Sequence, residues 1–219
     1  MSEAGPCPLC GRQLYGWIAL PVVVGEASIG VPLDQRAGER VIARCETCGV
    51  AVERGRELDL GAEWEAVCRA GEPGVREIAI PNRASFQAWI GEVGWAAIDR
   101  FPGRLLHTPA SLELLAQRNG HRLDRARTPI SGRAQGWMLQ TMLNGLTFHP
   151  NFAREVRAGR LRAGNSPRGR WAFAIDSVVT VLGAPLVLLL SAPSELVAAL
   201  VRRGGELTAS ARRDGVNGG

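Results

Sequence analysis

The chain has 219 residues, enough for one medium-sized domain and a small additional module, and its 46% apolar and 21% charged content is that of an ordinary globular protein. The net charge of +5 is the difference between 26 basic residues, all of them arginine, and 21 acidic residues. Together with the abundance of Ala, Gly and Val, this indicates the coding bias of a GC-rich genome, so the charge does not by itself predict a nucleic-acid-binding face.

The N-terminal residues predict an intracellular location. The segment MSEAGPCPLC lacks the positive and apolar regions of a signal peptide. Four of the five cysteines stand in two C-x-x-C pairs, which suits a reducing compartment and a metal site better than a disulfide framework. We therefore expect a cytoplasmic protein, with a peripheral membrane location as the further expectation developed below.

Residues 1–55 predict a zinc ribbon. Its expected ligands are the cysteines of the two pairs, Cys7, Cys10, Cys45 and Cys48. In each knuckle the following glycine, Gly11 or Gly49, lets the backbone turn so that amide groups face the sulfurs. Four thiolates fit a tetrahedral zinc ion with no open position, so the zinc is expected to be structural. Unligated or redox-active cysteines are the alternative.

Between the knuckles, residues 14–24 and 41–43 are apolar and predict the two strands of a long β-hairpin. A hairpin absorbs the long spacing between the cysteine pairs without moving its base. Because the hairpin is apolar rather than basic, it favours packing against protein over binding nucleic acid. The fifth cysteine, Cys68, stands alone in a predicted helix and is expected to be a buried, small apolar side chain.

Residues 56–127 predict a small α/β unit. The expected elements are helices over Trp64–Ala70, Ser85–Ile90 and Ala110–Asn119, and strands over residues 75–80 and 121–127. Thr108 is a good N-cap for the third helix, and Pro109 suits its first position. Three short motifs fall at fixed places in this order: EPG at residues 72–74 before the first strand, IPN at its end, and Asn119-Gly120-His121 before the second.

These motifs, the run from Trp95 to Pro109 and a final strand near residues 205–211 occur in an order that resembles the C-terminal half of class I S-adenosylmethionine-dependent methyltransferases. The resemblance is to the bacterial group that carries an N-terminal zinc ribbon. It implies a Rossmann-like sheet in which the strands at 75–80, 205–211 and 121–127 are neighbours.

The half of the domain that binds the cofactor in that family has no counterpart here. The family places S-adenosylmethionine against a glycine-rich turn and an acidic residue in the first half of the sheet. Residues 49–74, which stand before the first strand, contain no such glycine run, and they are too few for several βαβ units of about 30 residues each. The resemblance therefore implies no usual S-adenosylmethionine site.

The resemblance also implies two candidate catalytic residues, Asp99 and His107. In the family this segment lies near the acceptor site, where the two side chains would serve as acid and base. The segment departs from the family pattern, because the interval from Asp99 to Pro102 is one residue longer and the Phe after His107 is absent. The alternative, which we prefer, is that His107 only caps or pairs near the start of the next helix.

The missing half predicts an open sheet edge. The strand at 75–80 would normally be flanked by the lost strands, so its outer edge is expected to be unpaired, which is an aggregation hazard unless it is covered. The zinc hairpin could cover it, as could another chain. We therefore expect a protein partner, or a second copy of the chain, to dock by strand addition at 75–80.

Residues 128–204 predict a long helical insert. Helices are expected over residues 134–146 and 151–162, followed by an apolar run over 171–190 that breaks at Gly183-Ala-Pro185, and by a helix after a Ser194 cap. The stretch 178–190 is too short and too broken to span a bilayer, which requires a helix of about 20 residues. A buried hairpin and a monotopic membrane insertion remain open, and flanking arginines with Trp171 place the candidate membrane surface at 171–203.

The predicted architecture is an α/β protein: a four-cysteine zinc-ribbon hairpin followed by a truncated Rossmann-like methyltransferase half-sheet with a long helical insert. The predicted parts are the ribbon (1–55), the α/β part (56–127), the insert (128–204), a closing strand (205–213) and a disordered tail (214–219). The expected function is a non-catalytic, methyltransferase-like binding or scaffold protein. The alternatives are a methyltransferase, alone or completed by a partner chain, acting on a hydrophobic or lipid-linked acceptor, and, less favoured, a zinc-ribbon nucleic-acid binder.

Overall fold

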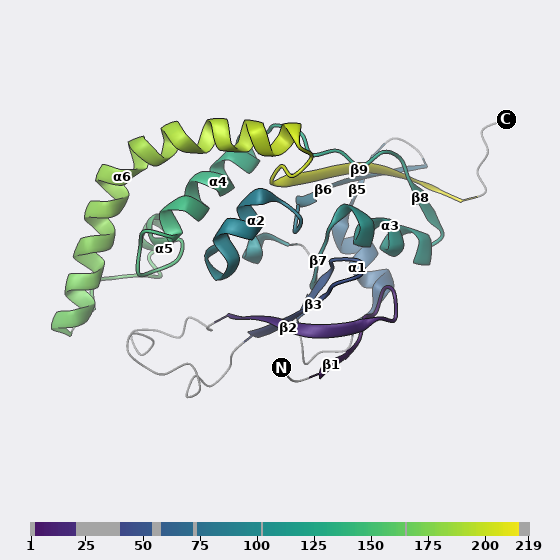
Figure 1. Cartoon of the computed structure of the whole chain (residues 1–219), viewed down its shortest axis with the longest axis horizontal. Coiled ribbons are helices and arrows are strands. Elements are labelled where there is room, and N and C mark those ends of the chain that lie inside the picture. The colour runs from purple at the N-terminus through teal and green to yellow at the C-terminus, as the bar shows by residue number, and fades with distance from the viewer. Residues whose placement is uncertain are drawn as a thin grey trace.

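The fold is a mixed α/β arrangement of two antiparallel sheets and one long helix (Figure 1). The computed structural model describes residues 3–20, 40–53, 58–71, 74–101, 103–164 and 166–214. The first sheet has the strand order β1 (Glu3–Pro6), β2 (Gln13–Leu20), β3 (Arg40–Cys45), β4 (Ala51–Glu53) and β7 (Leu105–Leu106). The second has the order β5 (Cys68–Ala70), β6 (Val75–Pro81), β9 (Glu206–Arg213) and β8 (His121–Leu123).

The predicted hairpin between the cysteine pairs is confirmed, because β2 and β3 pair in antiparallel fashion from Leu14 opposite Cys45 to Leu20 opposite Arg40. The tip of the hairpin, residues 21–39, lies outside the described residues. The sheet also takes in β7 from the central stretch, which pairs with β4. Both residues of β7 are buried. Because β4 pairs with β7, one sheet joins the predicted ribbon (1–55) to the predicted α/β part (56–127).

In the second sheet, β9 lies between β6 and β8 and is antiparallel to both. The predicted neighbourhood of the strands at 75–80, 205–211 and 121–127 is therefore present, although β8 ends at Leu123 and Arg127 forms only an isolated bridge to Thr208. Ile78 and Ile80 of β6 alternate with half-buried or exposed residues, which is the pattern of a strand with one face on a core.

The expected open edge along residues 75–80 is wrong for half of its length. The helix predicted over Trp64–Ala70 is α1 (Leu60–Val67), and the chain then becomes extended as β5. This strand pairs with β6 opposite Arg76–Ile78 and leaves only the end of β6 beyond it. Cys68 therefore starts a strand rather than lying in a helix, and its side chain is partly buried against the core.

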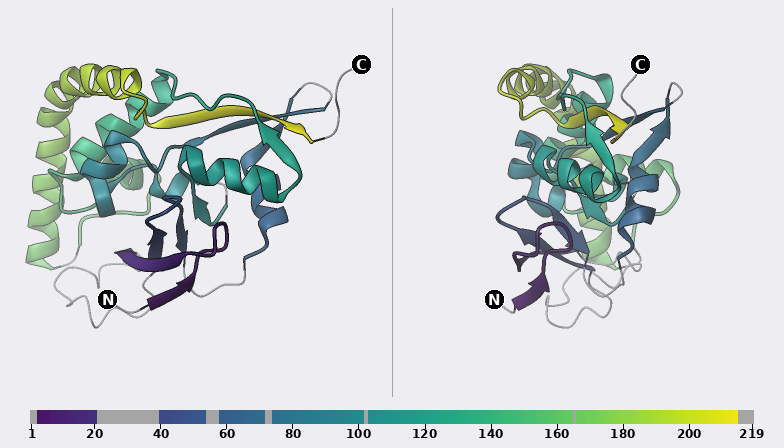
Figure 2. Two further views of the ribbon diagram at one scale, coloured as in Figure 1. Left: turned by 45° about the vertical axis from the view of Figure 1, so that its right-hand side comes forward. Right: turned by 90° about the vertical axis from the view of Figure 1, so that its right-hand side faces the viewer.

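The shorter helices are α2 (Phe86–Gly91), α3 (Pro109–Arg118), α4 (Gly132–Asn144) and α5 (Phe152–Arg157), with 3₁₀ turns η3 (Glu92–Gly94) and η4 (Ile98–Arg100). The predicted cap of α3 is confirmed: the Thr108 hydroxyl accepts from the Ser111 amide, and the Ser111 hydroxyl accepts from the Thr108 amide. In Figure 2, α3 lies between the two sheets. Its buried Leu112 and Leu115 join the cysteines to the core side of the second sheet.

The predicted break in the apolar insert is wrong. Residues 167–200 form one continuous helix, α6 (Pro167–Leu200), which contains Pro185 and Pro193 and is bent in Figure 1. Ser194 caps nothing, because its hydroxyl donates to the carbonyl oxygen of Leu190 at 2.8 Å. A proline inside a helix removes one backbone hydrogen bond and bends the helix, and the rest of the helix continues where packing supports it.

Candidate metal centre

The two cysteine knuckles have the same backbone geometry. The amide of Gly11 donates to the carbonyl oxygen of Cys7, and the amide of Gly49 donates to that of Cys45, both at 2.9 Å. Both glycines have a positive φ, 73° and 74°, a conformation that glycine adopts without the strain of a side chain. The repeated turn brings the two cysteines of each pair to one side of the backbone.

The four sulfur atoms form one cluster. The Sγ atoms of Cys7, Cys10, Cys45 and Cys48 all lie within 4.8 Å of one another. Across the two knuckles, Cys7 and Cys48 are 3.7 Å apart and Cys10 and Cys45 are 3.4 Å apart. A tetrahedral ion with metal–sulfur bonds of about 2.3 Å requires sulfur–sulfur distances of about 3.8 Å. The cluster can therefore hold a metal ion such as zinc.

The thiols of this cluster differ in acidity. Burial raises the pKa of Cys7 and of Cys48 above the usual cysteine value. Burial also raises the pKa of Cys45, but hydrogen bonds from the Cys48 amide and the Cys10 side chain outweigh it and lower this pKa to about 7. Because metal ligation requires thiolates, an ion that binds here must displace protons, and its affinity falls as the pH falls.

The knuckles are attached to both ends of α3. The Thr108 hydroxyl donates to the carbonyl oxygen of Cys48 at 2.7 Å, and Arg118 Nε donates to that of Leu9 at 3.0 Å. The fit at Gly49 is close, since a Cβ atom there would lie 2.8 Å from Thr108 Cγ2. An ion bound by four protein thiolates, three of them buried, has no position for substrate, so this site is suited to holding the fold together.

The structure buries one of the two candidate catalytic residues. The side chain of Asp99 lies outside the described part of the chain, so its distance from His107 is not defined. His107 is fully buried after β7, with Nδ1 3.4 Å from the Ser111 hydroxyl. Its Nε2 has no hydrogen-bond partner among the described residues. Burial lowers the pKa of His107 to about 3, so the imidazole is neutral in the folded protein.

The buried imidazole predicts a specific acid sensitivity. The unfolded chain binds a proton at His107 near pH 6.5, whereas the folded protein does not until about pH 3, so the stability that this residue contributes is present above pH 6.5 and is lost as the pH falls. We expect His107→Leu to remove about 1 kcal/mol of the stability loss between pH 6.5 and pH 5.5. Urea unfolding of zinc-loaded wild type and variant at both pH values measures this difference. Equal losses in the two proteins would contradict it.

Sequence reasoning did not assign a role to the buried carboxylates of the insert. Asp176 is fully buried and accepts hydrogen bonds from the amides of Phe148 and His149, at 2.8 and 3.0 Å. Glu195 accepts from the Gly205 amide at 2.7 Å and from Gln87 Nε2 at 3.2 Å. In the sequence, Asp176 and Glu195 each stand alone in an apolar run. A carboxylate in such a run is costly to bury unless it has a hydrogen-bonding or charged partner, and this was the feature that could have revealed both.

No protein-family model, curated protein or solved structure matches this chain. Within the described residues, two features other than the metal centre invite a functional interpretation. One is the exposed side of α6, and the other is a cavity beside β6.

Proposed function

We propose that this protein is a non-catalytic scaffold that docks on a membrane surface through α6. The observation that carries the proposal is the exposure of apolar side chains along this helix. The exposed large apolar residues of α6 are Trp171, Ile175, Val178, Val181, Leu182, Leu186, Leu188, Leu189, Leu190, Leu196, Val197 and Leu200. A continuous apolar surface of this kind on a folded protein indicates an interaction site.

Only one side of α6 packs against protein. Its buried residues are Asp176, Val187, Ser191, Glu195 and Ala198, and the helix packs against α4 and α5. The exposed apolar residues occupy the remaining surface, where Val181, Leu182 and Leu189 are each at least 70% exposed. In its most apolar 18-residue window α6 has a mean hydropathy of 2.2, with 11% of the window buried. A core helix can have the same composition, so the exposure of these apolar side chains is what favours membrane insertion.

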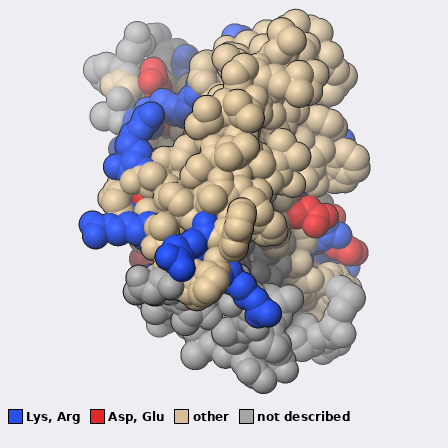
Figure 3. All heavy atoms as spheres, turned by 90° about the vertical axis from the view of Figure 1, so that its left-hand side faces the viewer, with Lys and Arg blue, Asp and Glu red and all other residues tan. Residues whose placement is uncertain are grey.

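The charges around α6 favour an anionic lipid surface. Between Arg170 and Arg202 the only charged residues are Asp176 and Glu195, and both are buried. Arginines therefore lie at the two ends of an uncharged surface, with Trp171 next to one of them. Figure 3 shows this surface along the first half of α6, free of charge, with basic residues at its left and lower margin and acidic and basic residues together at its lower right. Apolar insertion with a basic margin is typical of helices that lie in the interface of anionic membranes.

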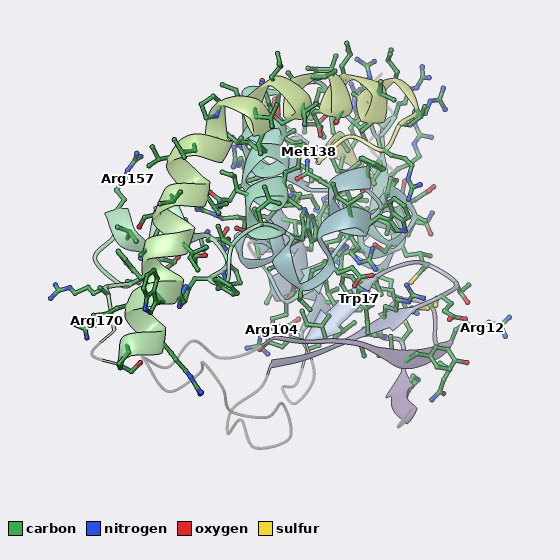
Figure 4. All side chains as sticks on the ribbon, turned by 60° about the vertical axis from the view of Figure 1, so that its left-hand side comes forward. Arg12, Trp17, Arg104, Met138, Arg157 and Arg170 are labelled. Carbon is green, nitrogen blue, oxygen red and sulfur yellow. The ribbon has the colours of Figure 1, made fainter. Side chains whose placement is uncertain are left out.

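A helix lying on the membrane fits the surroundings of α6 better than a helix spanning it. By length and composition alone α6 could cross a bilayer, because 34 residues extend about 51 Å against a hydrocarbon core of about 30 Å. However, α5 packs beside α6, and Arg157 and Arg170 extend outward from this region (Figure 4). Spanning would carry α5 and its Arg157 into hydrocarbon, at a cost of several kcal/mol for that arginine, whereas Arg170 at the end of α6 would reach the headgroups in either arrangement. Docking on the surface leaves both arginines among the lipid headgroups.

The rest of the chain supports a scaffold role. We propose that the second sheet is related to the C-terminal half of a class I methyltransferase sheet. The strand order β6, β9, β8 supports this relationship. Residues 49–74 contain no glycine-rich turn of the kind that binds the cofactor in that family, and the neutral, enclosed His107 is poorly suited to acid–base catalysis. The competing function, a methyltransferase alone or with a partner chain, would require saturable S-adenosylmethionine binding.

Vesicle binding tests the membrane proposal. Leu182→Asp and Leu189→Asp place a carboxylate where we expect the side chain to enter the lipid. Because inserting one leucine contributes about 1.5–3 kcal/mol, each variant is expected to bind at least about tenfold more weakly. The measurement is co-sedimentation of zinc-loaded protein with vesicles of phosphatidylcholine and phosphatidylglycerol, at low and high salt.

The matched control is Ile130→Asp, which makes the same kind of change at a residue that is 62% exposed and lies outside α6. It should bind vesicles as the wild type does. The proposal fails if wild-type protein stays in the supernatant with these vesicles. It also fails if all three variants bind equally well.

A further inference from the structure

A cavity of about 440 Å³ opens beside β6, at the place where β5 ends and the edge of β6 continues. Its floor includes Ala79 and Ile80 of β6, and its walls come from α1, β5, η4 and α4. This volume lies within the range of small-molecule sites. None of the residues lining it belongs to α6 or to the metal centre, so the cavity is separate from both.

Three arginines from three separate elements line the cavity. Arg69 comes from β5, Arg100 from η4 and Arg133 from α4, and no aspartate or glutamate is among the described lining residues. Arg133 is held by Glu206, with Nη1 2.8 Å from Oε1. Arg69 and Arg100 make no ion pair with a described residue. The abundance of arginine in this chain explains their number, but not their meeting around one cavity whose described lining residues include no acid, with Glu206 pairing only with Arg133.

The fourth side chain that matters is Trp137, one α-helical turn after Arg133. It lines the cavity and is partly buried against the cluster around Trp95. An indole in such a place offers a flat apolar surface to a planar ring, while arginine is the side chain that best binds phosphate oxygens in pairs. We infer that this cavity binds a small phosphate monoester that carries a planar ring, such as a nucleoside phosphate.

Calorimetric titration of the full-length, zinc-loaded chain with AMP tests this inference. The two halves of the probe serve as matched ligands: adenosine lacks the phosphate, and ribose 5-phosphate lacks the ring. We expect AMP to bind saturably and each half to bind at least about tenfold more weakly, because the arginines and Trp137 contact different parts of the ligand. Equal affinity for AMP and either half would overturn the inference, as would the absence of AMP binding.

Two variants locate the site. Arg69→Gln and Arg100→Gln are each expected to weaken AMP binding about tenfold, since each removes a charge-assisted bond to phosphate from a residue without a described ion pair. Arg122→Gln on β8 is the control, because Arg122 is exposed and lies outside the cavity. Circular dichroism and zinc content verify folding. AMP affinity that is unchanged in both cavity variants, or reduced equally in the control, would place binding elsewhere.

The same variants keep this inference apart from the membrane proposal. Arg69→Gln and Arg100→Gln should bind vesicles as the wild type does, and Leu182→Asp should bind AMP as the wild type does. If the cavity instead recognised lipid phosphate, the arginine variants would lose vesicle binding. That result would overturn the assignment to a soluble ligand.

Discussion

Cys48→Ser is expected to cost the protein its metal ion and most of its folded stability. Cys48 supplies one of four clustered sulfurs, and its carbonyl oxygen accepts the Thr108 hydroxyl at the start of α3. Structural zinc contributes on the order of 10 kcal/mol to small zinc-stabilised folds, which exceeds the total stability of many domains. We expect about one zinc per chain in the wild type and little in the variant, measured by elemental analysis, together with loss of the cooperative thermal transition.

Cys68→Ser is the matched control for this change. Cys68 lies outside the sulfur cluster, in β5, and burial raises the pKa of its thiol to about 11, so it remains a protonated, partly buried group at neutral pH. The control should keep both its zinc and its cooperative transition. Zinc content that is the same in Cys48→Ser and in wild type would show that the cluster is not the metal site.

Asp176→Ala is expected to destabilise the protein by about 3 kcal/mol or more, because it leaves buried donors unpaired. The Asp176 carboxylate accepts two backbone amides, and Oδ2 also lies 2.7 Å from His149 Nδ1. This carboxylate ties the first half of α6 to the turn after α4. Urea unfolding without lipid measures the stability. Hydrogen exchange should show faster exchange at Phe148 and His149 even under folded conditions.

Glu113→Ala is the control for the loss of a carboxylate. Glu113 is exposed on α3 and makes no described hydrogen bond or ion pair, so its removal should change the unfolding free energy by less than about 0.5 kcal/mol. If Asp176→Ala is as mild as this control, the carboxylate does not hold α6 in place. The bent helix would then depend on apolar packing alone.

The four-cysteine cluster could be predicted from the sequence because its geometry is local. Each knuckle is a turn of five residues that contains two ligands and the glycine the turn needs, so only the meeting of the two knuckles depends on the fold. The cap of α3 was predictable for the same reason, since Thr108, Pro109 and Ser111 stand within one turn. The adjacency of β6, β9 and β8 came instead from a resemblance, which no relative tests.

The errors concern segments whose structure depends on a neighbouring strand or helix rather than on their own residue pattern. Residues 68–70 follow a helical pattern, yet they become β5 because the edge of β6 offers unpaired backbone groups next to them. The expected break at Pro185 fails because α4 and α5 pack along α6 and support it on both sides of the bend. Local propensity predicts a longer α1 at residues 68–70 and a helix end at Pro185, and tertiary contacts override both tendencies.

By itself, the sequence determined the two cysteine knuckles, the N-cap of α3 and the uncharged surface between Arg170 and Arg202, because each depends on neighbouring residues or on the order of residues within one helix. The tertiary structure alone decided that His107 is enclosed, that Asp176 finds its donors and that Arg69, Arg100 and Arg133 meet in one cavity. These depend on which distant segments pack together. That choice is made by the burial of apolar surface and the pairing of backbone groups over the whole chain.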